Sequence, residues 1–146
     1  MHTHWNLRVY FLLCSPDNQA LLISNEIIRG SSYFKLPGGG VEFGEGIAEA
    51  ARREAIEELG VPVVLEQAFY FTDDYIPSLF KPDDQVIAFY YKVTSPQIEL
   101  IWKQRRFSAK DGSEQTFEWI PFEQINPEQF TLASDKVVLQ QFLQTI

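Results

Sequence analysis

Three glutamates near the middle of the chain carry the clearest chemical signal. Glu54, Glu57 and Glu58 stand at spacing i, i+3 and i+4, which places their carboxylates on one face of an α-helix. Like charges at this spacing repel one another, so the arrangement favours a cation held between them. Carboxylate oxygens are the ligands that Mg²⁺ and Mn²⁺ prefer, and Mg²⁺ commonly completes its shell with water and substrate phosphate. The spacing therefore predicts either a Mg²⁺ site, with Mn²⁺ as the alternative ion, that acts on a phosphate compound, or a solvated charged face with ordinary i, i+4 ion pairs.

The segment around these glutamates resembles the Nudix box, G-x5-E-x7-R-E-U-x-E-E-x-G-U, in which U is an aliphatic residue. Every fixed position is filled, in order, by Gly39, Glu45, Arg53-Glu54, Glu57-Glu58 and Gly60-Val61. The preceding Phe34-Lys35-Leu36-Pro37-Gly38 also fits the family. Two positions differ slightly from the usual residues of the family. Ala55 is smaller than the usual aliphatic residue, and Gly46 stands where the family often has Ser or Thr to cap the helix. A motif with this many fixed positions is far more specific than a lone glycine-rich triplet.

The resemblance implies a single Nudix-like domain over residues 1–146, built as an α/β/α sandwich with a mixed, curved sheet. It also implies Mg²⁺-dependent hydrolysis of a pyrophosphate bond in a nucleoside diphosphate linked to another moiety. Glu54, Glu57 and Glu58 would then ligate the metal. Arg53 would orient these carboxylates by hydrogen bonding, and Glu45 would support Arg53 and the adjoining loop.

The sequence gives weaker indications for the roles of the other residues of the expected site. The glycines Gly38, Gly39 and Gly40 allow close approach of the backbone to phosphate or metal, although a tight turn explains them too. A general base comes from the box or from a downstream loop, where Glu114 is the candidate and Glu118 the alternative. Two loops, 72–84 and 97–115, are expected to hold specificity.

The second loop contains the basic residues Lys103, Arg105, Arg106 and Lys110. These side chains either contact substrate phosphate or form a solvated face, which charge statistics favour. Among aromatic residues, Trp102, Tyr75 and Phe80 either stack on a base or pack in the core or a dimer contact. The doublets Asp73-Asp74 and Asp83-Asp84 are interpreted as turn formers.

Alternating strands and two helices must position these residues. A helix is predicted over residues 47–59, ended by Gly60 and Pro62, and a second over residues 134–143. Periodicity and β-branched or aromatic content predict the strands, namely 7–15, 20–24, 34–36, 63 to 70 or 72, 85–94 and 116–120.

Composition narrows the class of protein. The net charge is −8 and the pI about 4.7, which argues against a general nucleic-acid binder and against attraction to anionic membranes. The longest apolar run, 9–14, is too short to span a membrane, and no signal peptide is recognised. The single cysteine, Cys14, cannot form an internal disulfide and is expected in the core. A cytoplasmic enzyme follows, and the family resemblance adds a homodimer as a further expectation.

Two alternatives to an active enzyme remain open at this stage. A Nudix-fold nucleotide or metabolite sensor would have lost catalysis, although all the carboxylates of the box are present. An interaction domain with a charged helix would bind no Mg²⁺ at all. Isomerase chemistry on a prenyl diphosphate would need a cysteine near the site, and Cys14 lies well before the box. Neither the substrate within the nucleotide class nor the oligomeric state can be read from the sequence.

Overall fold

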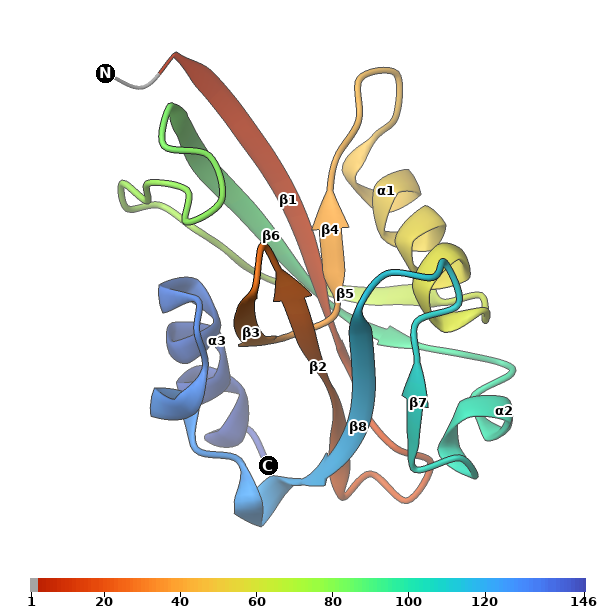
Figure 1. The fold of residues 1–146 in the computed structure, drawn as a ribbon. Helices are drawn as coiled ribbons and strands as arrows, with labels where there is room; N and C mark the ends of the chain where they lie inside the picture. Colours follow the sequence, from red (N-terminus) through yellow and green to blue (C-terminus); the bar gives the residue numbers. More distant parts are fainter. Residues whose placement is uncertain (1–2) are drawn as a thin grey trace.

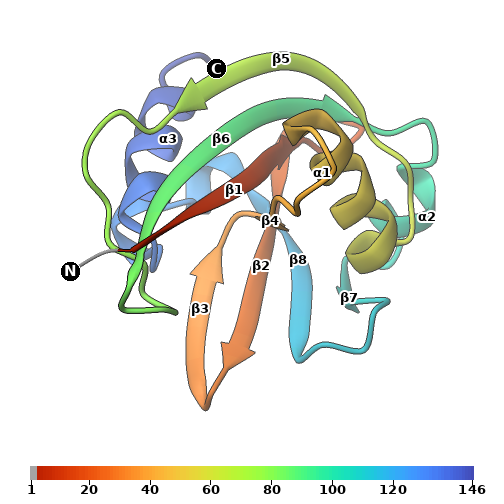
Figure 2. The same cartoon turned by 90° about the horizontal axis from the view of Figure 1, so that it is seen from above.

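Two four-stranded β-sheets form the centre of the protein in a computed structural model that describes residues 3–146. The first sheet has the order β4 (Gly38–Gly40), β1 (His4–Leu13), β6 (Asp84–Thr94) and β5 (Val64–Phe71). In it, β1 and β6 run parallel, whereas the other neighbours are antiparallel. The second sheet is antiparallel, with the order β3 (Ser31–Lys35), β2 (Ala20–Ile28), β8 (Gln115–Pro121) and β7 (Arg106–Ser108). Figure 2 shows the first sheet arching over the second.

Helices cover both sides of these strands. The helix α1 (Ile47–Glu54) continues into a π-helical turn, Ala55–Leu59, and lies on the opposite side of the strands from α3 (Ala133–Leu143) (Figure 1). A short α2 (Glu99–Trp102) precedes β7, and two 3₁₀ turns, Phe122–Gln124 and Pro127–Gln129, lead into α3. In residues 3–146, no helix has the length and apolar character needed to cross a membrane. The result is a layered α/β arrangement with a mixed, curved sheet, as the sequence predicted.

The strand β1 is buried on both faces, which explains why Val9 to Leu13 are all apolar. Side chains alternate across a strand, so Phe11 and Leu13 enter a core cluster shared with the end of the box helix. Tyr10 and Leu12 enter the second cluster, under α3. The helix α1 approaches this strand closely because Ala50 and Ala51 are small, and both pack against Val9.

The box helix differs from the prediction of one continuous α-helix over residues 47–59. Its start is closed by Glu49, whose Oε1 accepts the N–H of Gly46 (2.9 Å) because glycine has no side chain to act as a cap. Its last five residues widen into the π turn, in which the N–H of Gly60 donates to Ala55 O, five residues back (3.0 Å). Such single-turn insertions often mark functional sites.

Three short elements were missed by the sequence analysis. The glycine loop forms β4 and pairs with β1, while the segment predicted as a loop over residues 97–115 contains α2 and β7. These elements are only three or four residues long, so no hydrophobic period can develop in them. The predicted strands all exist with shifted ends, the largest shifts being the starts of β1 at His4 and of β3 at Ser31 and the end of β2 at Ile28. Cys14 is only partly buried, at the edge of the cluster under α3.

Candidate active site

Arg53 connects the glutamates of the box to one another and to β4. Its Nη2 donates to Glu45 Oε1 (2.7 Å) and to Gly40 O (2.8 Å), and its Nε donates to Glu45 Oε2 (3.0 Å). Its Nη1 donates to Glu54 Oε1 (3.0 Å) and to Glu57 Oε2 (3.2 Å). The hydrogen bond from Arg53 lowers the pKa of Glu45 to about 2, and its carboxylate partners raise the pKa of Arg53 itself, against the effect of burial. One guanidinium therefore fixes three carboxylates.

Glu54 lies directly against the glycines of β4. A Cβ added to Gly39 would lie 2.5 Å from Glu54 Oε1, closer than any real contact. The side chain of Glu54 is mostly buried. Burial raises its pKa, and Arg53 opposes this rise. The absence of a side chain at Gly39 therefore leaves the space that the Glu54 carboxylate occupies.

Glu58 is the most buried of the three glutamates. Its Oε2 accepts from Gln115 Nε2 (2.6 Å), and Gln115 Oε1 in turn accepts from Ser24 Oγ (2.6 Å). Its Oε1 is buried and has no hydrogen-bond partner in the described chain. Burial raises the pKa of Glu58 to about 7, although Lys35 and Gln115 oppose this rise. A buried carboxylate with a free oxygen binds either a proton or a cation.

These observations agree with a divalent cation at the box. As arranged here, no three His, Cys, Asp or Glu side chains in residues 3–146 form a preassembled ion site, and Arg53 Nη1 bridges Glu54 and Glu57. The donor set nevertheless fits a hard ion, because it offers carboxylate oxygens only. The free Oε1 of Glu58 provides the strongest indication.

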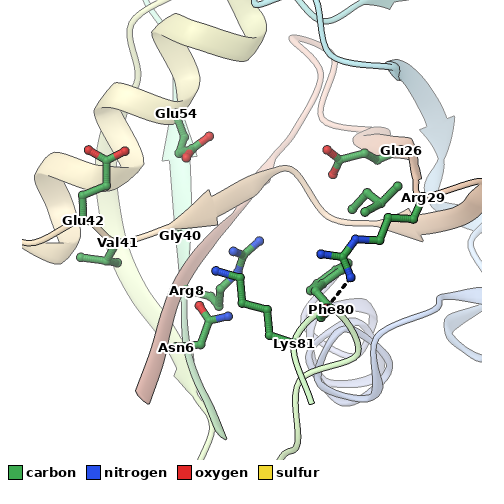
Figure 3. Close-up of a pocket in the computed structure, with 11 residues that line it drawn as sticks. Asn6, Arg8, Glu26, Arg29, Gly40, Val41, Glu42, Glu54, Phe80 and Lys81 are labelled. Carbon is green, nitrogen blue, oxygen red and sulfur yellow. Dashed lines mark hydrogen bonds between the residues drawn. The ribbon is translucent and has the colours of Figure 1, made fainter. Parts of the chain in front are cut away.

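A cavity of about 490 Å³ opens beside Glu54. Glu54 and Gly40 border it on the box side, and β1 contributes Asn6 and Arg8 (Figure 3). The remaining wall comes from the end of β2 and the turn after it, from the segment after β4 and from the loop before β6, through Glu26, Ile28, Arg29, Val41, Glu42, Phe80 and Lys81. We call this space the polar cavity.

Most residues of the polar cavity, and Gln115, were not predicted from the sequence. A signal for Asn6 and Arg8 was present, because they alternate with apolar Leu7 and Val9 and therefore share the face of Tyr10. Of the aromatic candidates, Phe80 lines this cavity. For Glu26, Arg29 and Lys81, proximity to the box arises only in the tertiary fold.

Other predicted site residues lie elsewhere. Trp102 packs edge-on against Trp119 with 5.3 Å between ring centroids, and Arg105 lies 4.1 Å above the Trp102 ring. Glu114 is exposed in the loop before β8, and Glu118 is exposed on β8. None of these four residues lines the polar cavity. Gly38 is buried in β4, where a Cβ would lie 2.1 Å from Val9 O.

Comparison with known proteins assigns the family. Residues 4–141 match the model of the NUDIX domain, which is nearly the whole chain, so the protein belongs to the Nudix family. Its similarity to the nucleoside triphosphatase NudI of Salmonella agona (strain SL483) is 38% identity over 78 residues. That stretch covers 53% of this chain and 45% of NudI, less than half of the relative's length.

Solved structures support the fold independently. The MutT protein of Methanosarcina mazei Go1 matches with a TM-score of 0.70 at 19% identity, covering 99% of this chain and 97% of that protein. A NUDIX hydrolase from Nitrosomonas europaea matches with a TM-score of 0.69 at 18% identity, covering 96% and 89%. The predictions of the family and of the fold class are therefore confirmed.

Proposed function

We propose that the protein is a Mg²⁺-dependent pyrophosphohydrolase acting on a nucleoside diphosphate linked to another moiety. The observation that carries this proposal is the complete set of box glutamates, of which Arg53 holds Glu54 and Glu57, beside a cavity that also contains cations. Similarity to a nucleoside triphosphatase supports the same reaction class. An intact box is also expected of an enzyme rather than of an inactive sensor.

The roles proposed for the box residues follow from their contacts. Glu54, Glu57 and Glu58 would hold Mg²⁺, with Mn²⁺ as the alternative ion. When bound, the ion would neutralise the phosphate oxygens and lower the pKa of a water molecule. Arg53 keeps Glu54 and Glu57 in place through its Nη1. The bare backbone of Gly39 leaves room for the Glu54 carboxylate.

The reaction is the addition of water to one phosphorus of the substrate, with cleavage of the bond to the bridging oxygen. A carboxylate must accept the proton from water. Our candidates outside the box are Glu114 and, as the alternative, Glu118. Both lie outside the polar cavity, so a carboxylate of the box itself is the third candidate. The predicted substrate contacts stay Gly38, Gly39, Gly40, Trp102 and Arg105.

The first test is product release from a panel of nucleoside diphosphate derivatives with Mg²⁺, using wild type and Glu57→Gln. We expect a loss of 100-fold or more in kcat/KM, since changes around a metal ligand alone cost about 10- to 100-fold. Glu123→Gln is the matched control, because it makes the same change to an exposed glutamate outside the polar cavity. Equal melting temperatures would show that all three proteins are folded.

The same panel separates the enzyme from its alternative. Turnover that disappears in Glu57→Gln supports the proposed reaction. Absence of turnover for every compound, together with Mg²⁺-dependent binding of one, would instead identify a sensor.

We also propose a reducing, cytoplasmic location, which is supported by a single cysteine, Cys14, whose thiol pKa is raised by burial.

A further inference from the structure

A second cavity, of about 210 Å³, adjoins the polar cavity. Asn6, Arg8 and Phe80 line both spaces. The rest of the second wall is mostly apolar and comes from the loop before β6, from β6 itself and from the start of α3, including Ile76, Leu79, Val86 and Leu132. We call this space the apolar cavity. A substrate that reaches both cavities must therefore carry a charged part and an uncharged part.

Arg8 lies at the boundary with free hydrogen-bond donors. Its Nε donates to Tyr10 Oη (3.1 Å), and its guanidinium lies 5.8 Å from the Tyr10 ring centroid and 5.7 Å from that of Phe80. Neither Nη atom has a hydrogen-bond partner within residues 3–146. These contacts hold the group in one orientation, and Gly40 leaves space beside Nη1. A fixed guanidinium with free donors is well suited to bind phosphate.

Lys81 provides a second cation in the polar cavity. Figure 3 shows its side chain and that of Arg8 extending toward the middle of the space, with Glu54 on the side of the box. In the described part of the chain, its ammonium has neither an ion pair nor a hydrogen bond. Arg29 differs, because its Nη1 already donates to Phe80 O (3.3 Å).

The acidic residues of the polar cavity, Glu26, Glu42 and Glu54, pair with cations other than Arg8 and Lys81, although Glu26 and Glu54 also act on the Arg8 charge through space. Glu26 faces the buried ammonium of Lys35 at 3.5 Å, and Glu54 is held by Arg53. Arg8 and Lys81 are therefore the cations left for a ligand. This pair differs from the basic residues 103–110, which the sequence had suggested as phosphate contacts.

The apolar cavity has the properties of a site for an aromatic base. The Phe80 ring forms part of its wall and can stack on a planar group. Two polar side chains, Asn6 and Thr131, lie at its edge. The Nδ2 of Asn6 donates to Asp84 Oδ2 (3.3 Å), so the Oδ1 of Asn6 is free to accept a hydrogen bond. The Oγ1 of Thr131 accepts from Phe34 N (2.9 Å), so the hydroxyl hydrogen of Thr131 is free to donate. An acceptor and a donor beside an apolar wall match the edge of a base.

We propose that the two cavities form one substrate site, in which Arg8 and Lys81 bind the phosphate chain of a mononucleoside di- or triphosphate and the apolar cavity binds its base. Arg8 is the specificity-determining residue, because it contacts both halves. This inference rests on the proposed function and names its substrate class. It places the phosphates between the cations of the polar cavity and the glutamates of the box.

The phosphate half is tested by steady-state kinetics on nucleoside di- and triphosphates with Arg8→Gln and Lys81→Gln. We expect KM to rise about tenfold or more in Arg8→Gln and kcat to change little, because a charged hydrogen bond in binding is lost. Arg52→Gln is the control for the loss of one positive charge, because Arg52 is exposed and lies outside the polar cavity. If Arg8→Gln has the same KM as Arg52→Gln, the phosphate half of the proposal is wrong.

The base half is tested with Ala133→Trp, which places a large ring at the wall of the apolar cavity from an exposed position. Inhibition by inorganic tripolyphosphate should weaken in Arg8→Gln and stay unchanged in Ala133→Trp. Inhibition by the free nucleoside should instead weaken strongly in Ala133→Trp and less in Arg8→Gln, because Arg8 lines both cavities. Equal effects of both variants on both inhibitors would overturn the division into two halves.

Two further outcomes separate this inference from the function on which it rests. Preference for an isoprenoid diphosphate over every nucleotide would overturn the base assignment while leaving a pyrophosphohydrolase. If wild type neither turns over nor binds any panel compound with Mg²⁺, the proposed function itself fails. Turnover by wild type with unaltered kinetics in Arg8→Gln and Ala133→Trp would overturn this inference alone.

Discussion

At the scale of single residues, Arg53 holds glutamates of the sequence motif in a defined three-dimensional arrangement. Its planar fork reaches Glu45, Glu54, Glu57 and Gly40 at once, which a lysine ammonium cannot reproduce. We expect Arg53→Lys to lower kcat/KM by about 10- to 100-fold, the usual cost of disturbing the groups around a metal ligand. Measured kcat/KM tests this expectation.

The neighbouring residue supplies the control for that experiment. Arg52→Lys changes an exposed guanidinium on the same helix and should leave kcat/KM unchanged. Wild-type activity in Arg53→Lys would show that positive charge alone is sufficient at this position.

The buried carboxylate of Glu58 is predicted to lower stability when no metal is bound. Its pKa is raised to about 7 by burial, so the folded state binds a proton more tightly than the unfolded state. Stability from this group is therefore present below about pH 4 and is lost as pH rises to about 7. At pH 8 in EDTA, Glu58→Gln should raise the free energy of unfolding by up to about 3 kcal/mol.

Urea unfolding measures this change, and Mg²⁺ provides the complementary result. The ion should stabilise wild type and have little effect on Glu58→Gln, whose activity should be lost. A variant less stable than wild type in EDTA would contradict the proposed cost of the buried charge.

The sequence predicts those site residues whose contacts are with residues close to them in the chain. The box glutamates and Arg53 lie within one helix and its preceding loop, so spacing alone brings them together. Gln115 reaches Glu58 from a strand 57 positions later, and Arg8 reaches the polar cavity from β1. No local pattern encodes such contacts, although polar residues on the face of a buried strand do mark a site worth testing.

At the scale of elements, strand β4 contains one glycine that is needed for the fold, Gly38, and one that is needed for activity, Gly39. Gly38 has φ +142°, and a Cβ there would meet the backbone of Val9, so Gly38→Ala should destabilise the β1–β4 pairing by about 2 kcal/mol or more. Gly39 would instead meet only the end of the Glu54 side chain. We therefore expect Gly39→Ala to keep most of its stability and to lose activity, because the carboxylate must move.

Thermal unfolding together with kcat/KM measures both effects. Gly112→Ala is the control, since Gly112 also has a positive φ but an open surrounding, and it should lose about 1 kcal/mol of stability without losing activity. Full activity in Gly39→Ala would show that Glu54 tolerates displacement.

Long elements were predicted better than short ones for a physical reason. A hydrophobic pattern can be recognised in the long elements β1, β6 and α3. It cannot be recognised in α2, β4 and β7, which have only three or four residues each. The π turn at Ala55–Leu59 was also hidden, because its sequence favours an ordinary helix. Its geometry accompanies the burial of Glu58, whose partner Gln115 lies on another element.

At the scale of the whole molecule, Asp135 connects three distant parts of the chain. At the start of α3, its oxygens accept from Leu36 N (3.1 Å) and Tyr90 Oη (2.5 Å). Burial raises its pKa to about 6, although these hydrogen bonds oppose the rise. Protons bind the folded state more tightly, so this group's contribution to stability falls as pH rises from about 4 to about 6.

We expect the loss from Asp135 to reach about 3 kcal/mol between pH 4 and pH 7. Asp135→Asn keeps an acceptor and cannot ionise, so its free energy of unfolding should fall less over this interval. Denaturant unfolding at several pH values measures the difference. Asp111→Asn, in an exposed loop, should follow wild type, and a parallel pH profile for Asp135→Asn would exclude Asp135 as the cause.

The parallel pairing of β1 with β6 has a consequence for the order in which the protein acquires its structure during synthesis. The two strands pair from His4–Asp84 to Leu13–Val93, so the central pair closes only after most of the chain has been translated. Until then β1 is an apolar strand without its main neighbour, and such exposed edges promote aggregation. Nascent chains that stop before β6 should therefore depend on chaperones, whereas chains that include β6 should become protease-resistant.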